Sequence, residues 1–196
     1  LHDFAALRAI HNVRVIAPAD QAETRAAVRL AAAATTPVYL RFGKAPMVEV
    51  HPAGAEPALT TAAVLRDGRD VAFLATGETV VHALLAAEEL AAGGLSARVL
   101  SVPTIKPLDR AAVLAAGRDC GAVVTVEEHS VHGGLGEAVA ATLLGAGVSV
   151  PFRIVGLPDE DTVTGAQADI FRHYGISMEG LAATARSLVQ APLPVR

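Results

Sequence analysis

The stretch AVVTVEEHSVHGGLGEAVAATLL, Ala122–Leu144, changes its apolar spacing halfway along. Ala122–Val126 is a short apolar, β-branched run, which is typical of a strand buried on both faces. Glycines follow at positions 133, 134 and 136, and apolar residues then recur at helical spacing from Leu135. The stretch therefore predicts a strand, a glycine-rich turn and a helix. Because ligands meet the carboxyl ends of strands in open α/β sheets, this turn marks a candidate working edge.

Upstream of this stretch, residues 1–45 predict a short α/β segment, and residues 46–57 predict a linker. The linker is punctuated by Pro46, Pro52, Gly54 and Pro57 and keeps no periodicity. The expected elements of the first segment are a helix at Asp3–Ile10, a strand at Val13–Ala17, a helix from the N-cap Asp20 to about Ala34, and a strand at Val38–Phe42. About forty residues cannot cover both faces of a sheet. We therefore expect further strands for this segment from the same chain or another.

Residues 58–196 predict a regular alternation of strands and helices, interrupted by a loop at Pro103–Pro107 and followed by a loose Pro-rich tail at Ala191–Arg196. The expected strands are Ala62–Leu65, Val71–Ala75, Ala97–Val102, Ala122–Val126 and Phe152–Val155. The expected helices follow Thr76-Gly77-Glu78-Thr79, Asp109 and the opening turn, with two more at Ala166–His173 and Glu179–Val189. This order predicts a three-layer α/β/α domain with a mostly parallel sheet.

The composition excludes several classes of function. The net charge of −4 comes from interspersed charges, which argues against nucleic-acid binding. Apolar runs are short and broken, so no transmembrane helix is expected. A lone cysteine, Cys120, excludes an internal disulfide framework and fits a reducing, cytoplasmic compartment. The first residue is Leu1, so we expect a piece of a longer protein whose active-site residues lie upstream.

Two glycine-rich turns are candidate phosphate cradles. Gly133-Gly134-Leu135-Gly136 opens a helix, where free N–H groups favour anions. The alternative is a tight strand-to-helix turn, since neither a Walker motif nor G-x-G-x-x-G is present. Thr76-Gly77-Glu78 is weaker, because Glu78 repels an anion.

The polar residues around the opening turn allow several interpretations. His129 and His132 could form a proton-transfer pair or bind metal, although a third ligand is not evident. Glu127 and Glu128 alternate along a strand, so they point to opposite faces and cannot form one carboxylate pair. Cys120 is interpreted as a small core residue rather than a reactive thiol.

Arg41 is the best single ligand candidate. It lies at the carboxyl end of the predicted strand, next to Gly43 and Lys44, and a guanidinium there suits a bidentate contact with phosphate or carboxylate. The alternatives are an exposed strand-end cation or a structural ion pair.

The order of several motifs resembles the C-terminal part of the transketolase family over almost the whole chain. Leu7–Val13, followed by Ala17-Pro18-Ala19-Asp20 and Glu23-Thr24, resembles the family's "LRAIPN…PAD…ET" segment, with His11 in place of the usual Pro. The other matching runs are Pro37–Arg41, Ser101–Asp109, Val126–Ser130 with Gly133–Gly136, Gly156–Asp159 and His173–Ile176.

The resemblance implies an enzyme dependent on thiamine diphosphate and Mg²⁺ that transfers two-carbon ketol units between sugar phosphates. It divides the chain into the end of a pyrimidine-binding domain (1–45), a linker (46–57) and a transketolase-type C-terminal domain (58–196). The cofactor ylid would act as nucleophile and electron sink. The diphosphate- and metal-binding domain, the activating glutamate and the substrate histidines have no matching positions here. Arg41 alone matches a residue associated with the substrate phosphate.

The resemblance also implies partners. The chain would work with the remainder of a longer chain or with a separate N-terminal subunit that carries the diphosphate-binding domain, in a homo- or heterodimer or tetramer. We therefore expect the chain alone to be inactive. The alternatives are a non-catalytic assembly domain, the β subunit of a 2-oxoacid dehydrogenase E1, or a deoxyxylulose-phosphate synthase. The Val-Pro-Thr-Ile-Lys-Pro-Leu-Asp and Glu-Glu-His-Ser runs favour transketolase.

Overall fold

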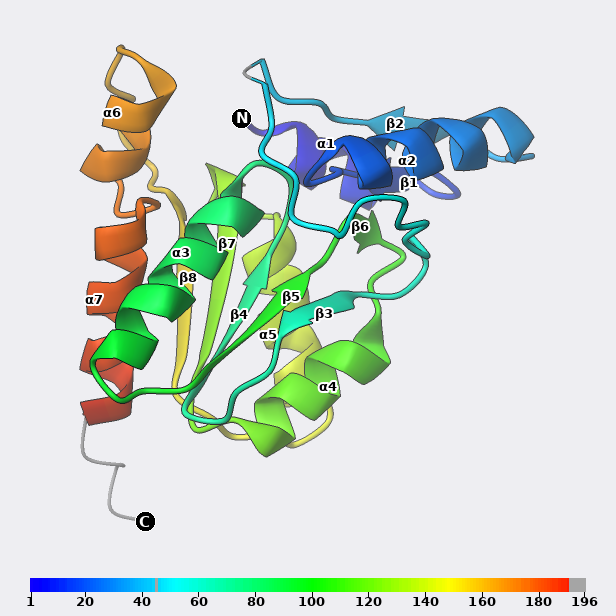
Figure 1. Cartoon of the computed structure of the whole chain (residues 1–196). Coiled ribbons are helices and arrows are strands. Elements are labelled where there is room, and N and C mark those ends of the chain that lie inside the picture. Colours follow the sequence, from blue (N-terminus) through cyan, green and yellow to red (C-terminus); the bar gives the residue numbers. More distant parts are fainter. Residues whose placement is uncertain (45, 191–196) are drawn as a thin grey trace.

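The computed structural model describes residues 1–44 and 46–190 (Figure 1). Ala45, the last residue of the expected first segment, and the Pro-rich tail at residues 191–196 lie outside the described residues. The helices are α1 (Asp3–Ala9), α2 (Gln21–Ala33), α3 (Thr79–Ala92), α4 (Arg110–Asp119), α5 (Leu135–Gly145), α6 (Gln167–His173) and α7 (Met178–Gln190). The strands are β1 (Arg14–Ile16), β2 (Val38–Leu40), β3 (Ala63–Arg66), β4 (Val71–Ala75), β5 (Ala97–Ser101), β6 (Thr104–Lys106), β7 (Val123–Ser130) and β8 (Phe152–Leu157).

The larger sheet has the order β3-β5-β4-β7-β8 within the described residues. Strands β5, β4, β7 and β8 are parallel, and β3 pairs antiparallel with β5 at one edge. Helices α3 and α7 pack together against one face, whereas α4 and α5 cover the other (Figure 1). This arrangement confirms the predicted α/β/α layers and the mostly parallel sheet.

The central strand β4 shows why a continuous apolar run forms the middle of this sheet. All five residues of Val71–Ala75 are buried. Their side chains alternate between the two faces: Phe73 contributes to the core beneath α3 and α7, and Leu74 to the core beneath α4 and α5. Burial on both faces selects continuous apolar sequence, as in other parallel sheets.

The smaller sheet corrects one sequence expectation. Thr104–Lys106, within the predicted loop at Pro103–Pro107, forms β6 and pairs antiparallel with β1, giving the order β2-β1-β6. The first segment therefore does take a strand from elsewhere, and that strand comes from a much later part of the same chain. The two sheets are thus joined through the short connection between β5 and β6.

Two predicted helix caps are present. The Asp20 carboxylate accepts a hydrogen bond from the Glu23 N–H at 2.9 Å, and Asp109 accepts one from Ala112 at 3.0 Å. The Glu23 carboxylate bonds the N–H of Ala19 rather than that of the cap residue, so only half of a capping box forms.

A buried polar cluster ties the first segment to the linker and to the larger sheet. Asp20 Oδ2 accepts hydrogen bonds from the backbone N–H groups of Val50 and His51, each at 3.0 Å. Glu23 accepts a hydrogen bond from the Ser101 hydroxyl on β5 at 2.6 Å. Burial raises the pKa of Glu23, which is fully shielded from solvent. These contacts hold α2 against the end of β5.

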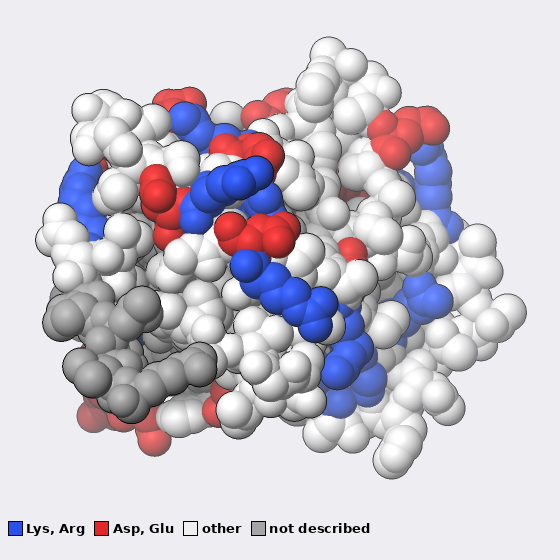
Figure 2. Space-filling view, turned by 90° about the horizontal axis from the view of Figure 1, so that it is seen from below, with Lys and Arg blue, Asp and Glu red and all other residues white. Residues whose placement is uncertain are grey.

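Charges on the surface are mixed. Basic and acidic side chains lie next to one another on the face shown in Figure 2. Arg98, for example, pairs with both Asp67 and Asp119, at 2.9 and 3.3 Å. Among the described residues, none of the helices is both long and apolar enough to cross a bilayer.

Candidate functional site

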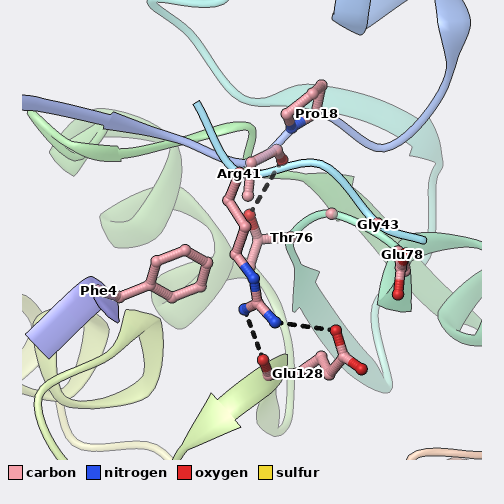
Figure 3. A pocket seen from close by; sticks show the side chains of 9 residues that line it. Phe4, Pro18, Arg41, Gly43, Thr76, Glu78 and Glu128 are labelled. Atoms are coloured by element: carbon pink, nitrogen blue, oxygen red, sulfur yellow. Dashed lines mark hydrogen bonds and ion pairs between the residues drawn. The ribbon is translucent and has the colours of Figure 1, made fainter. Parts of the chain in front are cut away.

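The carboxyl ends of the two sheets meet at one pocket (Figure 3). Ala17 and Pro18 follow β1, Arg41 and Gly43 follow β2, and Thr76-Gly77-Glu78 follows β4. Glu128 near the end of β7 and Phe4 from α1 complete the lining. A backbone hydrogen bond joins the two sheets at this edge, because the Gly77 N–H after β4 donates to the Ala17 carbonyl after β1 at 3.1 Å. The pocket therefore lies where open α/β sheets bind ligands.

Arg41 is the only cation that lines this pocket in the part of the chain the structure describes. Its Nη1 donates to the Glu128 carbonyl at 2.6 Å and its Nη2 to the Glu128 carboxylate at 2.9 Å. The guanidinium lies over the Phe4 ring, 5.0 Å from its centroid, and its Nε is 3.8 Å from Asp3 Oδ2. Its side chain is only 18% exposed. Of the alternatives open for Arg41, the structure excludes a freely solvated cation and shows an ion pair at the pocket.

Glu78 and Gln167 extend the polar network beyond Arg41. The Gln167 side-chain amide donates to Glu128 Oε1 at 3.2 Å and also to Glu78 Oε2. The second Glu78 oxygen is buried without a hydrogen-bond partner and lies against the backbone of Gly43. Burial, together with the neighbouring Glu128 charge, raises the pKa of Glu78. The carboxyl groups of Glu78 and Glu128 thus share one donor, the side-chain amide of Gln167.

The glycine-rich turn before α5 is filled by a carboxylate of the chain itself. Glu127 accepts hydrogen bonds from Leu135 and Gly136 at 2.7 and 2.8 Å. A Cβ on Gly134 would overlap the Glu127 carboxylate, so glycine is required by close approach. Because these amides are occupied, the turn is a packed strand-to-helix connection, and the alternative of a phosphate cradle is wrong for these residues.

Strand β7 continues to Ser130, four residues beyond the predicted end at Val126. Its alternation sends Glu127 toward α5 and Glu128 toward Arg41, as the two-residue period predicts. Burial raises the pKa of Glu127 to about 7, against the opposing hydrogen bonds from Gly136 and Leu135.

The two histidines of this region do not form a pair. His129 is buried, stacks on Phe4 at 4.8 Å and accepts a hydrogen bond from the Ala5 N–H through Nε2. His132 is 65% exposed at the side chain and lies 3.5 Å from Glu137. The proton-transfer pair and metal site considered for His129 and His132 are therefore not assembled. Cys120 is buried, and burial raises the pKa of its thiol, as suits a core residue.

The described residues do not fit the diphosphate or the metal ion that the resemblance implies. They contain no cluster of three or more His, Cys, Asp or Glu side chains able to hold a metal ion. At the turn before α5, the Gly133 N–H donates to the Glu137 carboxylate. The N–H groups of Leu135 and Gly136 donate to Glu127. In the turn after β4, the N–H groups of Thr76 and Gly77 likewise donate to backbone carbonyls, those of Val126 and Ala17.

The sequence singled out Arg41 but missed most of its surroundings. Asp3, Phe4 and Gln167 carry no local motif, and they come from elements that are distant along the chain. The sequence predicts that Glu78 repels anions, and its carboxyl lines the pocket.

Two family models match the chain in the order of its two sheets. The transketolase pyrimidine-binding domain matches residues 1–47, and the transketolase C-terminal domain matches residues 60–181. The chain is thus an α/β protein with a small sheet and a larger, mostly parallel sheet that helices cover on both faces. It belongs to the transketolase family.

Curated relatives agree with this assignment. The chain is 42% identical over 97% of its length to an apulose-4-phosphate transketolase subunit of Phocaeicola vulgatus. It is 40% identical over 97% to the 6-deoxy-6-sulfo-D-fructose transketolase subunit SqwH of a Clostridium species, and 40% identical over 92% to the 1-deoxy-D-xylulose-5-phosphate synthase of Thermomicrobium roseum. It spans 61%, 59% and 29% of these relatives, respectively.

A solved structure described as "Split gene transketolase, inactive beta4 tetramer" has the same fold. The TM-score is 0.86 at 37% identity, and the alignment covers 96% of this chain and 61% of that chain.

Proposed function

We propose that this chain is the C-terminal portion or the small subunit of a thiamine-diphosphate-dependent enzyme that transfers two-carbon ketol units between sugar phosphates. The observation that carries the proposal is the pair of family matches, which follow one another along almost the whole chain. The relatives from Phocaeicola vulgatus and the Clostridium species support a split assembly, because each is itself named as a subunit.

In this proposal the chain is divided at 1–45, 46–57 and 58–196. The first part ends a pyrimidine-binding domain, the second is a linker, and the third is the C-terminal domain. The matched ranges 1–47 and 60–181 support these boundaries. The linker would be held through Asp20, whose carboxylate bonds the backbone of Val50 and His51.

Arg41 would bind the anionic group of the substrate. It lies at the carboxyl edge of both sheets, it is planar and permanently charged, and it suits a bidentate contact with a phosphoryl group. Relatives whose names include a 4-phosphate and a 6-sulfo sugar support an anionic substrate.

The cofactor and Mg²⁺ would be bound mainly by the rest of the assembly, because the described residues do not fit either group. The cofactor, when bound, supplies the nucleophile and electron sink of ketol transfer. This chain's own part would be a wall of the substrate entrance and a contact between subunits, in a dimer or tetramer. The lone cysteine favours a reducing compartment such as the cytoplasm.

Reconstitution tests the proposal. The chain is combined with the segment or subunit that carries the diphosphate-binding domain, and ketol transfer is assayed with thiamine diphosphate and Mg²⁺. We expect activity from the assembly only. Ketol transfer by the 196-residue chain alone, or micromolar cofactor binding by it in calorimetry, would overturn the assignment.

A second candidate is a deoxyxylulose-phosphate synthase, favoured by the 40% identity to the Thermomicrobium roseum enzyme. The two candidates differ in the donor they cleave. An assembly that releases CO₂ from pyruvate, rather than exchanging ketol units between sugars, would identify the synthase.

A further inference from the structure

The guanidinium of Arg41 already holds an anion that belongs to the chain. Glu128 bonds it at 2.9 Å through its carboxylate and at 2.6 Å through its backbone carbonyl (Figure 3). These two contacts use Nη1 and Nη2, the two terminal nitrogens with which an arginine can bind a phosphoryl group. The carboxylate therefore occupies one of the guanidinium positions that a substrate anion needs.

The charges around Arg41 favour release of that carboxylate when another anion arrives. Three carboxyl groups pair with this guanidinium or line its pocket among the described residues, and each comes from a different element. They are Asp3 on α1, Glu78 before α3 and Glu128 on β7. A phosphoryl group added to this set would be repelled unless one carboxylate moved away.

The structure provides a second place for the Glu128 carboxylate. Its Oε1, the oxygen that does not bond Arg41, already accepts a hydrogen bond from Gln167 Nε2 at 3.2 Å. Gln167 bonds Glu78 as well, and burial together with the Glu128 charge raises the pKa of Glu78. The carboxylate can thus leave Arg41 and keep the hydrogen bond from Gln167.

We propose that Glu128 is a built-in occupant of the anion site on Arg41, which a phosphoryl-bearing substrate displaces toward Gln167. The inference rests on the proposed role of Arg41 in substrate binding. Because only the fraction of molecules with a free guanidinium binds tightly, Glu128 lowers the apparent affinity for anions. A neutral sugar end cannot compete with a tethered carboxylate, whereas a dianionic phosphoryl group can.

An arginine–carboxylate pair also lies outside this pocket. Arg29 and Glu56 form an exposed pair at 3.5 Å, with side chains 70% and 83% exposed. Glu56→Gln therefore makes the same chemical change as Glu128→Gln at a pair outside the pocket, and serves as a matched control.

The test is a titration of the 196-residue chain and its variants with inorganic phosphate, followed by NMR, with folding checked by circular dichroism. We expect Glu128→Gln to tighten phosphate binding by about tenfold, because the amide keeps the side-chain shape and removes the competing charge. Gln167→Leu should weaken binding, because the displaced carboxylate loses its second partner. Glu56→Gln should leave the affinity unchanged.

Arg41→Met separates this inference from the proposed function. If Arg41→Met weakens phosphate binding while Glu128→Gln leaves the affinity as it was, displacement is wrong and the anion site on Arg41 stands. Equal tightening by Glu128→Gln and Glu56→Gln would also overturn displacement, since net charge alone would explain it. If Arg41→Met has no effect, the proposed role of Arg41 fails, and the inference fails with it.

Discussion

The Glu127 carboxylate accepts a hydrogen bond from the Gly136 N–H at 2.8 Å, so the positive end of helix α5 is neutralised by a residue of the preceding strand. Leu135 donates to the other oxygen at 2.7 Å. The glycine-rich sequence that first suggested a phosphate site thus serves a close packing of strand, turn and helix.

The buried Glu127 predicts a pH dependence of stability. Its pKa is raised to about 7 in the folded chain, against a reference of 4.5. Between these values the folded chain binds more protons than the unfolded chain, so the free energy of unfolding falls as the pH rises, by on the order of 3 kcal/mol. Urea unfolding at pH 4 and pH 8, on either side of both pKa values, measures this difference.

Glu127→Gln should reduce that pH-dependent loss, because the amide does not ionise. Glu137→Gln is the control, since Glu137 caps the Gly133 N–H at the same turn but is exposed. The role given to the buried carboxyl is contradicted if the free energy of unfolding of Glu127→Gln still falls with pH as in the parent chain. It is also contradicted if Glu137→Gln loses this pH dependence to the same extent.

Gly134→Ala tests the close packing of the turn. A Cβ at Gly134 overlaps the Glu127 carboxylate, so we expect a loss of about 1–3 kcal/mol in the free energy of unfolding. Gly145→Ala, at the other end of α5, is the matched control. It meets open space, and we expect a stabilisation of about 0.5–1 kcal/mol from helix propensity. Equal effects of the two substitutions would show that the turn tolerates a side chain.

Ser101→Ala tests the contact between the first segment and the larger sheet. The variant leaves the buried Glu23 carboxylate without its side-chain donor, which should cost about 1–3 kcal/mol of unfolding free energy. Ser187→Ala removes an exposed hydroxyl that bonds its own helix, and should change stability by less than about 0.5 kcal/mol. Chemical denaturation compares the two variants, and matching values would show that the Glu23–Ser101 contact does not stabilise the fold.

Many of the strands and helices could be predicted from the sequence, because the signals that define them are local. The apolar run Val71–Ala75 lies on a strand, and the caps Asp20 and Asp109 begin helices as predicted. Such signals reside in a few neighbouring residues, where burial on both faces or an unpaired helix N–H selects the residue type.

Elements set by distant contacts could not be predicted in the same way. Strand β6 has three residues next to prolines at 103 and 107, and its pairing with β1 defines it. The surroundings of Arg41 have the same origin, since Phe4, Glu128 and Gln167 meet there only after folding. The sequence indicated a guanidinium at a strand end, and the fold supplied its counter-ion.

The most direct measurement is the effect of Arg41→Ala on acceptor choice in the reconstituted enzyme, with Arg29→Ala as the control at an exposed ion pair. We expect kcat/KM to fall at least about tenfold more for a phosphorylated acceptor than for an unphosphorylated one, because a charge-assisted bidentate contact is lost. An equal loss for both acceptors would contradict the assignment of Arg41 to the substrate anion.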